Sequence, residues 1–284
     1  MARTGKGKAA GGITGGVLTF LLTFFLTFLT LWQPASAQDA ATPLTPYSRE
    51  CQIGGQLIAA SPLPNVATAL DNRKKIRILT IGASAAAGRR FSKGGYTAQI
   101  EQILEHALQG LDVVMINRGI SGELAANAAT RIRTEVALTS PDLVLWQVGT
   151  NDALAYVPLP YLEAAVIDTI HWLRAHHVDV ILVGLQYVDA MARNSNYIAV
   201  RDMLRQIAAK ENVLIVRRGD AMQLIEKAAA GEGAFRPDEF ERTEAGYNCL
   251  AEYVARAIAL GAFGKTLRPT SSQAPAKIAP AASQ

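Results

Sequence analysis

KKIRILTIGASAAAG, at residues 74–88, joins an apolar run to a turn of small residues. The apolar run at residues 76–81 is typical of a buried strand, and it ends at Gly82 in a turn that carries one hydroxyl, Ser84. In open α/β proteins, ligands bind beyond the carboxyl ends of the strands, where such turns lead into helices. We therefore expect Ser84 to lie at the ligand-binding edge of a parallel sheet.

Five short apolar runs along the chain predict the strands of this sheet. They lie at residues 76–81, 113–116, 143–148, 178–185 and 213–216. Near-continuous apolar runs are typical of parallel strands that are covered on both faces. Helical spacing of apolar residues recurs between and after them, around residues 100–108, 123–138, 162–173, 200–207 and 250–258. This alternation predicts a three-layer α/β/α sandwich around a five-stranded parallel sheet.

The two ends of the chain differ in composition from this central part. Residues 1–37 combine a basic start, an apolar run and the small-residue sequence Ala-Ser-Ala, which is the order expected of a secretory signal peptide. A retained membrane anchor is the alternative, but the apolar run at 17–32 is short for a span of about 20 residues. Composition further predicts a flexible lead-in at 38–50, a single domain at 51–262 and a disordered Pro/Ala/Ser-rich tail at 263–284.

The chain of 284 residues is 50% hydrophobic, with a formal net charge of +4. This apolar content is enough for a full core. Because the predicted leader holds three of the basic residues and no acidic ones, the remaining chain is nearly neutral. We therefore expect no nucleic-acid partner, and we expect export to the periplasm or the extracellular space. Residues 48–72 show little periodicity, and we expect them to wrap the domain as irregular structure.

Cys51 and Cys249 are the only two cysteines of the chain. In an exported protein a lone pair is a candidate disulfide. The bridge would close a very long loop, which is worth about 4 kcal/mol in the chain-entropy model. Two unrelated buried thiols are the alternative, because cysteine is often a small core residue; the pairing is the favoured interpretation.

Polar residues follow several of the predicted strands at the same edge of the sheet. Ser84 follows the first strand, Gly122 the second and Asn151 the third, whereas Asp238 and Glu241 come after the fifth strand and a helix. Each residue alone has a simpler explanation, such as a helix cap or a loop residue that bonds its own backbone. Their joint placement in this order favours a functional site.

This constellation resembles the SGNH (GDSL-type) hydrolases over about residues 76–260. The resemblance implies a flavodoxin-like fold and a serine ester or acyl hydrolase. Ser84 matches the family's nucleophile. Gly122 and Asn151 match the residues that form the oxyanion hole together with the backbone N–H of Ser84. Acyl transfer needs a nucleophile, a base that takes its proton, and donors where the oxyanion develops.

The sequence departs from the family's pattern at two positions. Ala83 stands where the G-D-S turn has its aspartate, a position that supports the loop. Glu241 stands where the D-x-x-H block has the catalytic histidine, and the matches at Asp238, Gly246 and Tyr247 support this alignment. The four histidines are expected at the amino ends of the strands, away from the site: His106, His171, His176 and His177.

Two functions stay open from these residues. In the first, an Asp238/Glu241 pair replaces the family's Asp/His pair; glutamate is a weaker base than histidine unless burial or a like charge raises its pKa. In the second, the chain is an inactive hydrolase fold that binds an acylated ligand in the cell envelope. A nucleotide or phosphate binder is disfavoured because GASAAAG lacks the middle glycine of a dinucleotide fingerprint.

The sequence indicates no cofactor. Loop carboxylates can hold a cation, and four lie in the predicted site loops: Asp152, Asp238, Glu239 and Glu241. We interpret these four as surface charges and predict no metal site. The resemblance implies a small-molecule ester or an acylated glycan or lipid as substrate, and membrane contact only through an uncleaved leader. Four large side chains are candidates for the pocket lining, the core or the surface: Tyr96, Tyr156, Tyr187 and Met191.

Overall fold

The computed structural model describes residues 47–58, 61–82, 95–108, 110–229 and 243–263. All of them belong to one compact unit, residues 41–284. Several predictions fall outside the described residues: the signal peptide, most of the lead-in and the tail, and the site residues Ser84, Asp238 and Glu241.

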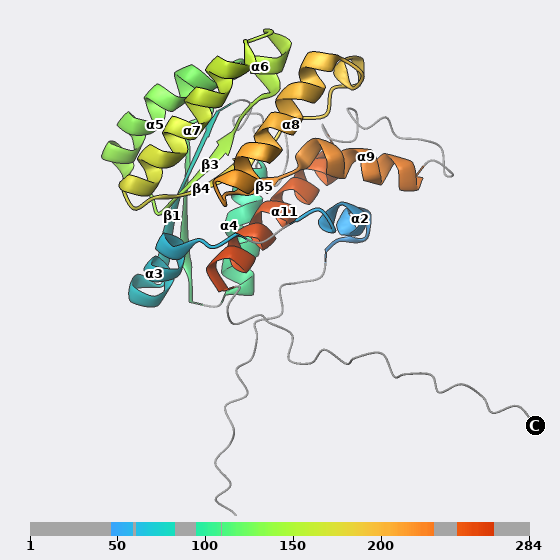
Figure 1. Cartoon of the computed structure of the whole chain (residues 1–284). Coiled ribbons are helices and arrows are strands. Elements are labelled where there is room, and N and C mark those ends of the chain that lie inside the picture. The colour runs from blue at the N-terminus through green and yellow to red at the C-terminus, as the bar shows by residue number, and fades with distance from the viewer. Residues whose placement is uncertain (1–46, 59–60, 83–94, 109, 230–242, 264–284) are drawn as a thin grey trace, which may run out of the picture. The chain divides into compact units, whose positions relative to one another are not determined.

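Five parallel strands form one sheet in the order β2-β1-β3-β4-β5 (Figure 1). They are β1 (Lys75–Gly82), β2 (Asp112–Asn117), β3 (Leu143–Gln147), β4 (Asp179–Val183) and β5 (Leu214–Val216). The five predicted strands and their parallel arrangement are confirmed. The strand order reverses between β1 and β3, as in the flavodoxin-like fold, and such a switch point is where open α/β sheets bind ligands.

Helices cover both faces of the sheet, so the predicted α/β/α sandwich is confirmed. They are η1 (Arg49–Cys51), α2 (Gln52–Gly55), α3 (Pro64–Arg73), α4 (Tyr96–Ala107), α5 (Ala125–Thr139), α6 (Thr150–Leu154), α7 (Leu159–Ala175), η3 (Asp189–Met191), α8 (Ser195–Lys210), α9 (Arg218–Ala229) and α11 (Glu244–Phe263). Figure 1 shows α5 and α7 on one side of the sheet and α4 and α11 on the other. Within the described residues, no helix has the length and apolar character needed to cross a membrane.

The alternation of side chains along β1 explains why its apolar run is nearly continuous. Ile78 is fully buried with Ile100 of α4 on one face of the sheet. The next residue, Leu79, is fully buried with Ile132 of α5 on the other face. Successive residues of a strand point to opposite faces, so a sheet covered on both faces needs apolar residues at both.

Helix α3 contradicts the expectation that residues 48–72 are irregular. It begins with Pro64. The first N–H groups of a helix have no acceptor within the helix, so the N–H that proline lacks costs no hydrogen bond there. The carboxylate of Asp179, at the start of β4, accepts hydrogen bonds from the backbone N–H groups of Asn65 and Val66, both at 2.9 Å. The cap comes from a residue more than a hundred positions away, so the local sequence does not reveal it.

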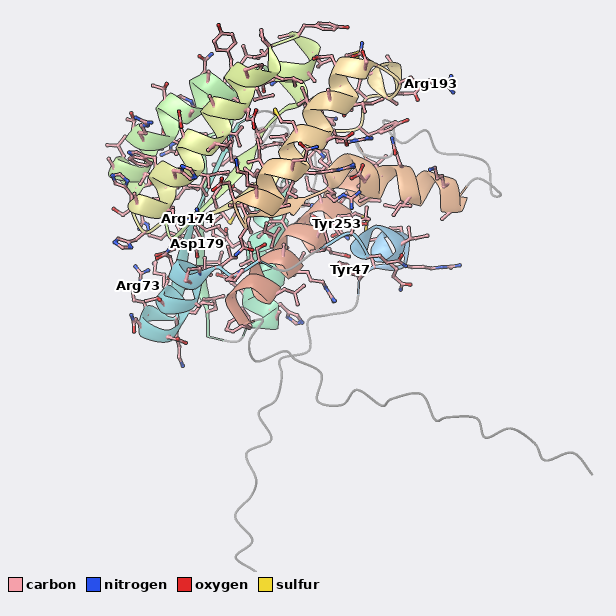
Figure 2. All side chains as sticks on the ribbon, viewed as in Figure 1. Tyr47, Arg73, Arg174, Asp179, Arg193 and Tyr253 are labelled. Carbon is pink, nitrogen blue, oxygen red and sulfur yellow. A yellow bond between two sulfur atoms is a disulfide. The ribbon has the colours of Figure 1, made fainter. Side chains whose placement is uncertain are left out.

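Residues 47–50, the end of the predicted flexible lead-in, are packed against α11. The rings of Tyr47 and Tyr253 meet edge to face with centroids 5.6 Å apart, and Figure 2 shows the two side chains close together. The backbone N–H of Ser48 donates to Glu252 at 2.9 Å. Side chains of a distant helix thus hold these four residues, a set of contacts that composition alone does not reveal.

The predicted disulfide between Cys51 and Cys249 is confirmed. It joins η1 to α11 across 198 positions of sequence, with the Cα atoms 5.1 Å apart. Both cysteines are fully buried, and the Tyr253 hydroxyl donates to the Cys51 carbonyl oxygen at 2.8 Å. The bridge therefore forms part of the core.

Removal of this bridge should destabilise the fold. Cys51→Ser, Cys249→Ser and the double variant should each lower the free energy of unfolding by about 2–4 kcal/mol. The three losses should be nearly equal, because each variant removes the same cross-link. Thermal unfolding without reductant measures this, and reduced wild type should match the variants. Additive losses from the two single variants would contradict the prediction.

Candidate active site

Strand β1 ends at Gly82, between β2 and β3 at the carboxyl edge of the sheet. The φ angle of Gly82 is +99°, and a Cβ there would lie 2.0 Å from the carbonyl oxygen of Gln147 in β3. Only glycine fits so close to the neighbouring strand. The carbonyl oxygen of Gly82 also accepts a hydrogen bond from the N–H of Ile120 at 3.1 Å. β1 therefore ends between the loops that follow β2 and β3, two residues before Ser84.

The loop after β2 carries Gly122 with a φ angle of +81°. No atom lies within 4 Å of a Cβ built there, so the backbone conformation rather than space requires glycine. Within the described part of the chain, the N–H of Gly122 has no hydrogen-bond acceptor. This N–H is available as a donor, as an oxyanion hole requires.

The segment after β3, which we call the Asn151 loop, runs from Val148 into the first turn of α6 and places Asn151 beside this glycine. Its Nδ2 donates to the carbonyl oxygen of Glu123, the residue after Gly122, at 2.9 Å. The Glu123 carboxylate is itself fixed by Arg131, whose Nε lies 2.6 Å away. An asparagine amide has two N–H donors, so one stays available. The structure thus brings together the two predicted oxyanion residues that it describes.

Asp152 does not carry the surface charge that the sequence suggested. It is 2% exposed, and its Oδ1 accepts a hydrogen bond from the backbone N–H of Ala125 at 2.9 Å, at the start of α5. Burial raises the pKa of Asp152, while the hydrogen bond from Ala125 acts in the opposite direction. This carboxylate connects the Asn151 loop to the helix that follows Gly122.

The same loop is also tied to the segment that follows β4. Gly149 has a φ angle of +100°, and a Cβ there would lie 2.6 Å from Leu204 and 2.8 Å from Leu185. The Oγ1 of Thr150 accepts a hydrogen bond from the N–H of Gln186 at 2.9 Å. The carboxyl ends of β3 and β4 therefore form one connected surface.

The first turns of three helices, α4, α9 and α11, also lie close together at this edge. Tyr96, the first residue of α4, is 1% exposed. Burial raises its pKa, the nearby cation of Arg218 opposes the shift, and the phenol of Tyr247 adds to it. In sequence, α4 follows the Ser84 turn and α11 follows Glu241. The starts of these two helices therefore meet at the candidate site.

Comparison with known proteins identifies the family. Residues 50–263 match the Non-GDSL lipase-like family. The chain belongs to this family. An arylesterase of Vibrio mimicus is 28% identical over 112 residues, which are 39% of this chain and 54% of that protein. Esterase TesA of Pseudomonas aeruginosa is 28% identical over 135 residues, which are 44% of this chain and 66% of that protein. The chain therefore spans less than two thirds of the length of either relative.

Solved structures of esterases have the same fold. A crystal structure of TesA has a TM-score of 0.51 at 23% identity, and it covers 64% of this chain and 97% of that one. Axe2, an acetylxylan esterase from Geobacillus stearothermophilus, has a TM-score of 0.53 at 21% identity and covers 64% and 94%. The predicted resemblance to SGNH hydrolases and their fold is confirmed.

The four histidines of this lipase-like chain lie at the opposite edge of the sheet, as predicted. His106 lies in the last turn of α4. His171 pairs with Glu211 at 2.8 Å, just before β5. His176 and His177 immediately precede β4. No histidine of the chain therefore lies beside Gly122 and Asn151.

The four large side chains named as pocket candidates have different environments. Tyr96 is buried in the core, whereas Tyr156 is 60% exposed and its hydroxyl accepts a hydrogen bond from Asn194. Met191 is half-buried. Tyr187 lines a cavity beside the carboxyl ends of β4 and β5.

Sequence reasoning missed the arginines that surround this cavity. Its lining includes Arg201, Arg205, Arg217 and Arg218. The signal available in the sequence was the Arg217–Arg218 pair directly after the fifth predicted strand. Among the described residues, no group of three or more His, Cys, Asp or Glu is placed to hold a metal ion.

Loss of the Asp152 cap should destabilise the protein. Asp152→Ala should lower the free energy of unfolding by about 1–3 kcal/mol, because it leaves a buried backbone N–H at the start of α5 without an acceptor. Asp168→Ala, on the exposed face of α7, is the matched control and should change it by less than about 0.5 kcal/mol. Denaturant unfolding measures both, and equal effects would rule out the capping role.

Proposed function

We propose that this protein is an exported carboxylic ester hydrolase that works by acyl transfer to Ser84. Its membership of a lipase-like family and its esterase relatives support this function. The structural observation that carries the proposal is the contact between the two candidate oxyanion loops. Asn151 Nδ2 donates to the carbonyl oxygen next to Gly122, at the edge where β1 ends.

In the proposed reaction, the Oγ of Ser84 attacks the ester carbonyl carbon and loses its proton to a base. The tetrahedral oxyanion accepts hydrogen bonds from the Gly122 N–H, the Asn151 Nδ2 and the Ser84 N–H. The alcohol leaves with a proton, and water then hydrolyses the acyl-enzyme by the same steps.

Glu241 is the proposed base, with Asp238 three residues before it in the chain. An ordinary glutamate has a pKa of about 4.3 against about 6.5 for histidine, so it accepts a serine proton less readily. A neighbouring carboxylate favours the protonated form and raises the pKa of such a group toward the working pH. The Asp238/Glu241 pair would thus take the place of an aspartate–histidine pair.

The proposed substrate is a small-molecule ester or an acylated glycan or lipid in the cell envelope. The predicted leader at residues 1–37 would direct the chain to the periplasm or the extracellular space. The Cys51–Cys249 disulfide fits this location, because disulfides form and persist in oxidising compartments.

A second candidate function is an envelope module that binds an acylated ligand without cleaving it. It is favoured by one observation, the position of all four histidines at the far edge of the sheet. A serine hydroxyl is a weak nucleophile while protonated, so without an effective base the cleft would bind esters only.

Hydrolysis of p-nitrophenyl acetate by residues 38–284, produced in an oxidising compartment, tests both functions. Ser84→Ala should abolish the activity, and Asn151→Ala should lower kcat about 100- to 1,000-fold, because each removes a group that acts in the transition state. Ser195→Ala, an exposed serine at the start of α8, should leave the activity unchanged.

Glu241→His separates the esterase from the binding module. If Glu241 is the base, wild type turns over, its rate falls as the pH drops through a carboxylate pKa, and Glu241→His moves this fall toward about pH 6.5. Activity that appears only in Glu241→His would indicate an intact cleft without a base. Wild-type activity that survives Ser84→Ala would refute the assigned nucleophile.

A further inference from the structure

A cavity lies beside the carboxyl ends of β4 and β5, next to the first turns of α8 and α9. Its lining includes four arginines and a single carboxylate: Arg201, Arg205, Arg217, Arg218 and Asp220. We call this feature the arginine pocket. Figure 1 shows α8 and α9 close to the β5 edge of the sheet. Part of its lining, such as Gly184 and Arg217, lies just beyond the carboxyl ends of β4 and β5, at the edge that also holds Gly122 and Asn151.

Carboxylates neutralise only part of the positive charge. The Oδ2 of Asp220 accepts a hydrogen bond from Arg217 Nε at 2.7 Å and also pairs with Arg205. Asp202, beside the pocket, accepts from Arg201 Nε and Arg205 Nη1, both at 3.0 Å. The guanidinium groups of Arg201, Arg205 and Arg217 thus face two carboxylates among the described residues, so these three arginines keep an excess of positive charge.

Two of the arginines keep most of their donors available. A guanidinium has five N–H donors, and Arg201 and Arg217 each use only Nε in hydrogen bonds to the described residues. Their side chains are 29% and 36% exposed. Arg218 is instead only 2% exposed, so it is not among the arginines that offer donors to solvent.

The arginine pocket and the Asn151 loop share side chains. Leu185 and Leu204 line the pocket. They are also the side chains nearest to Gly149, two residues before Asn151. The N–H of Gln186, next to Leu185, donates to Thr150 in the same loop. The arginine pocket and the Asn151 loop are therefore neighbours that pack against the same two buried leucines.

We propose that the arginine pocket binds a carboxylate or phosphate group carried by the ester substrate. Guanidinium groups bind both anions through paired N–H donors. An anion held there would fix the rest of the substrate relative to the oxyanion donors. This inference rests on the proposed esterase function, which it refines to esters that carry a negative charge.

Calorimetric titration of the Ser84→Ala chain with inorganic phosphate and with glutarate tests the pocket without ester cleavage. Ionic strength is held constant with chloride, because salt screens exposed charges. Both Arg201→Gln and Arg217→Gln should bind at least one of the two probes about tenfold more weakly, since each loses charge-assisted hydrogen bonds. The probe that binds identifies the anion as a phosphate or a carboxylate.

Arg193→Gln is the matched control. Arg193 is exposed on the same connection between β4 and α8 but does not line the pocket, and Figure 2 shows its side chain pointing away from the protein. The control should bind the probe like the parent chain, and unchanged melting temperatures show that all variants are folded. No saturable binding, or equal affinity in all variants, would overturn the proposal.

Hydrolysis separates this inference from the proposed function. Mono-p-nitrophenyl glutarate should be cleaved with a higher kcat/KM than p-nitrophenyl butyrate by wild type, and Arg217→Gln should remove this preference. Arginine-dependent anion binding without any hydrolysis would support the pocket and refute the esterase. Hydrolysis of both esters with no anion binding would support the esterase and refute the pocket.

Discussion

The candidate site depends on the close approach of β1 to β3 at the carboxyl edge of the sheet. Gly82 makes this approach possible, because any side chain there would collide with the backbone of Gln147. Gly122 and Gly149 also have positive φ angles, so the chain leaves each of the first three strands through a conformation that favours glycine. β1 therefore ends beside the two loops that carry Gly122 and Asn151.

Two buried aspartates then fix helices to this framework from a distance. Asp152 caps α5 beside the candidate site, and Asp179 caps α3 at the opposite edge. Burial raises the pKa of both carboxyl groups, and hydrogen bonds from backbone N–H groups offset part of this cost. The edge that holds Asn151 therefore stays in place through polar contacts as well as through the apolar core.

The periodicity of apolar residues was sufficient to predict the strands, the covering helices and the common edge of the Gly122 and Asn151 loops, because burial on two faces leaves a clear pattern. It did not predict α3, whose cap comes from β4, or the buried position of Asp152. The arginine pocket was missed for the same reason: Arg201 and Arg217 come together only when α8 packs beside the end of β5. Glu241 and Ser84 stay predictions, since they lie outside the described residues.

The Cys51–Cys249 bridge has a topological consequence. Its two cysteines lie 198 positions apart, and the segment between them includes the whole sheet and every residue assigned to the site. A protease that cuts once in any of the enclosed loops leaves two pieces that are still covalently joined. The protein therefore keeps its parts together after a single nick until a reductant opens the bridge.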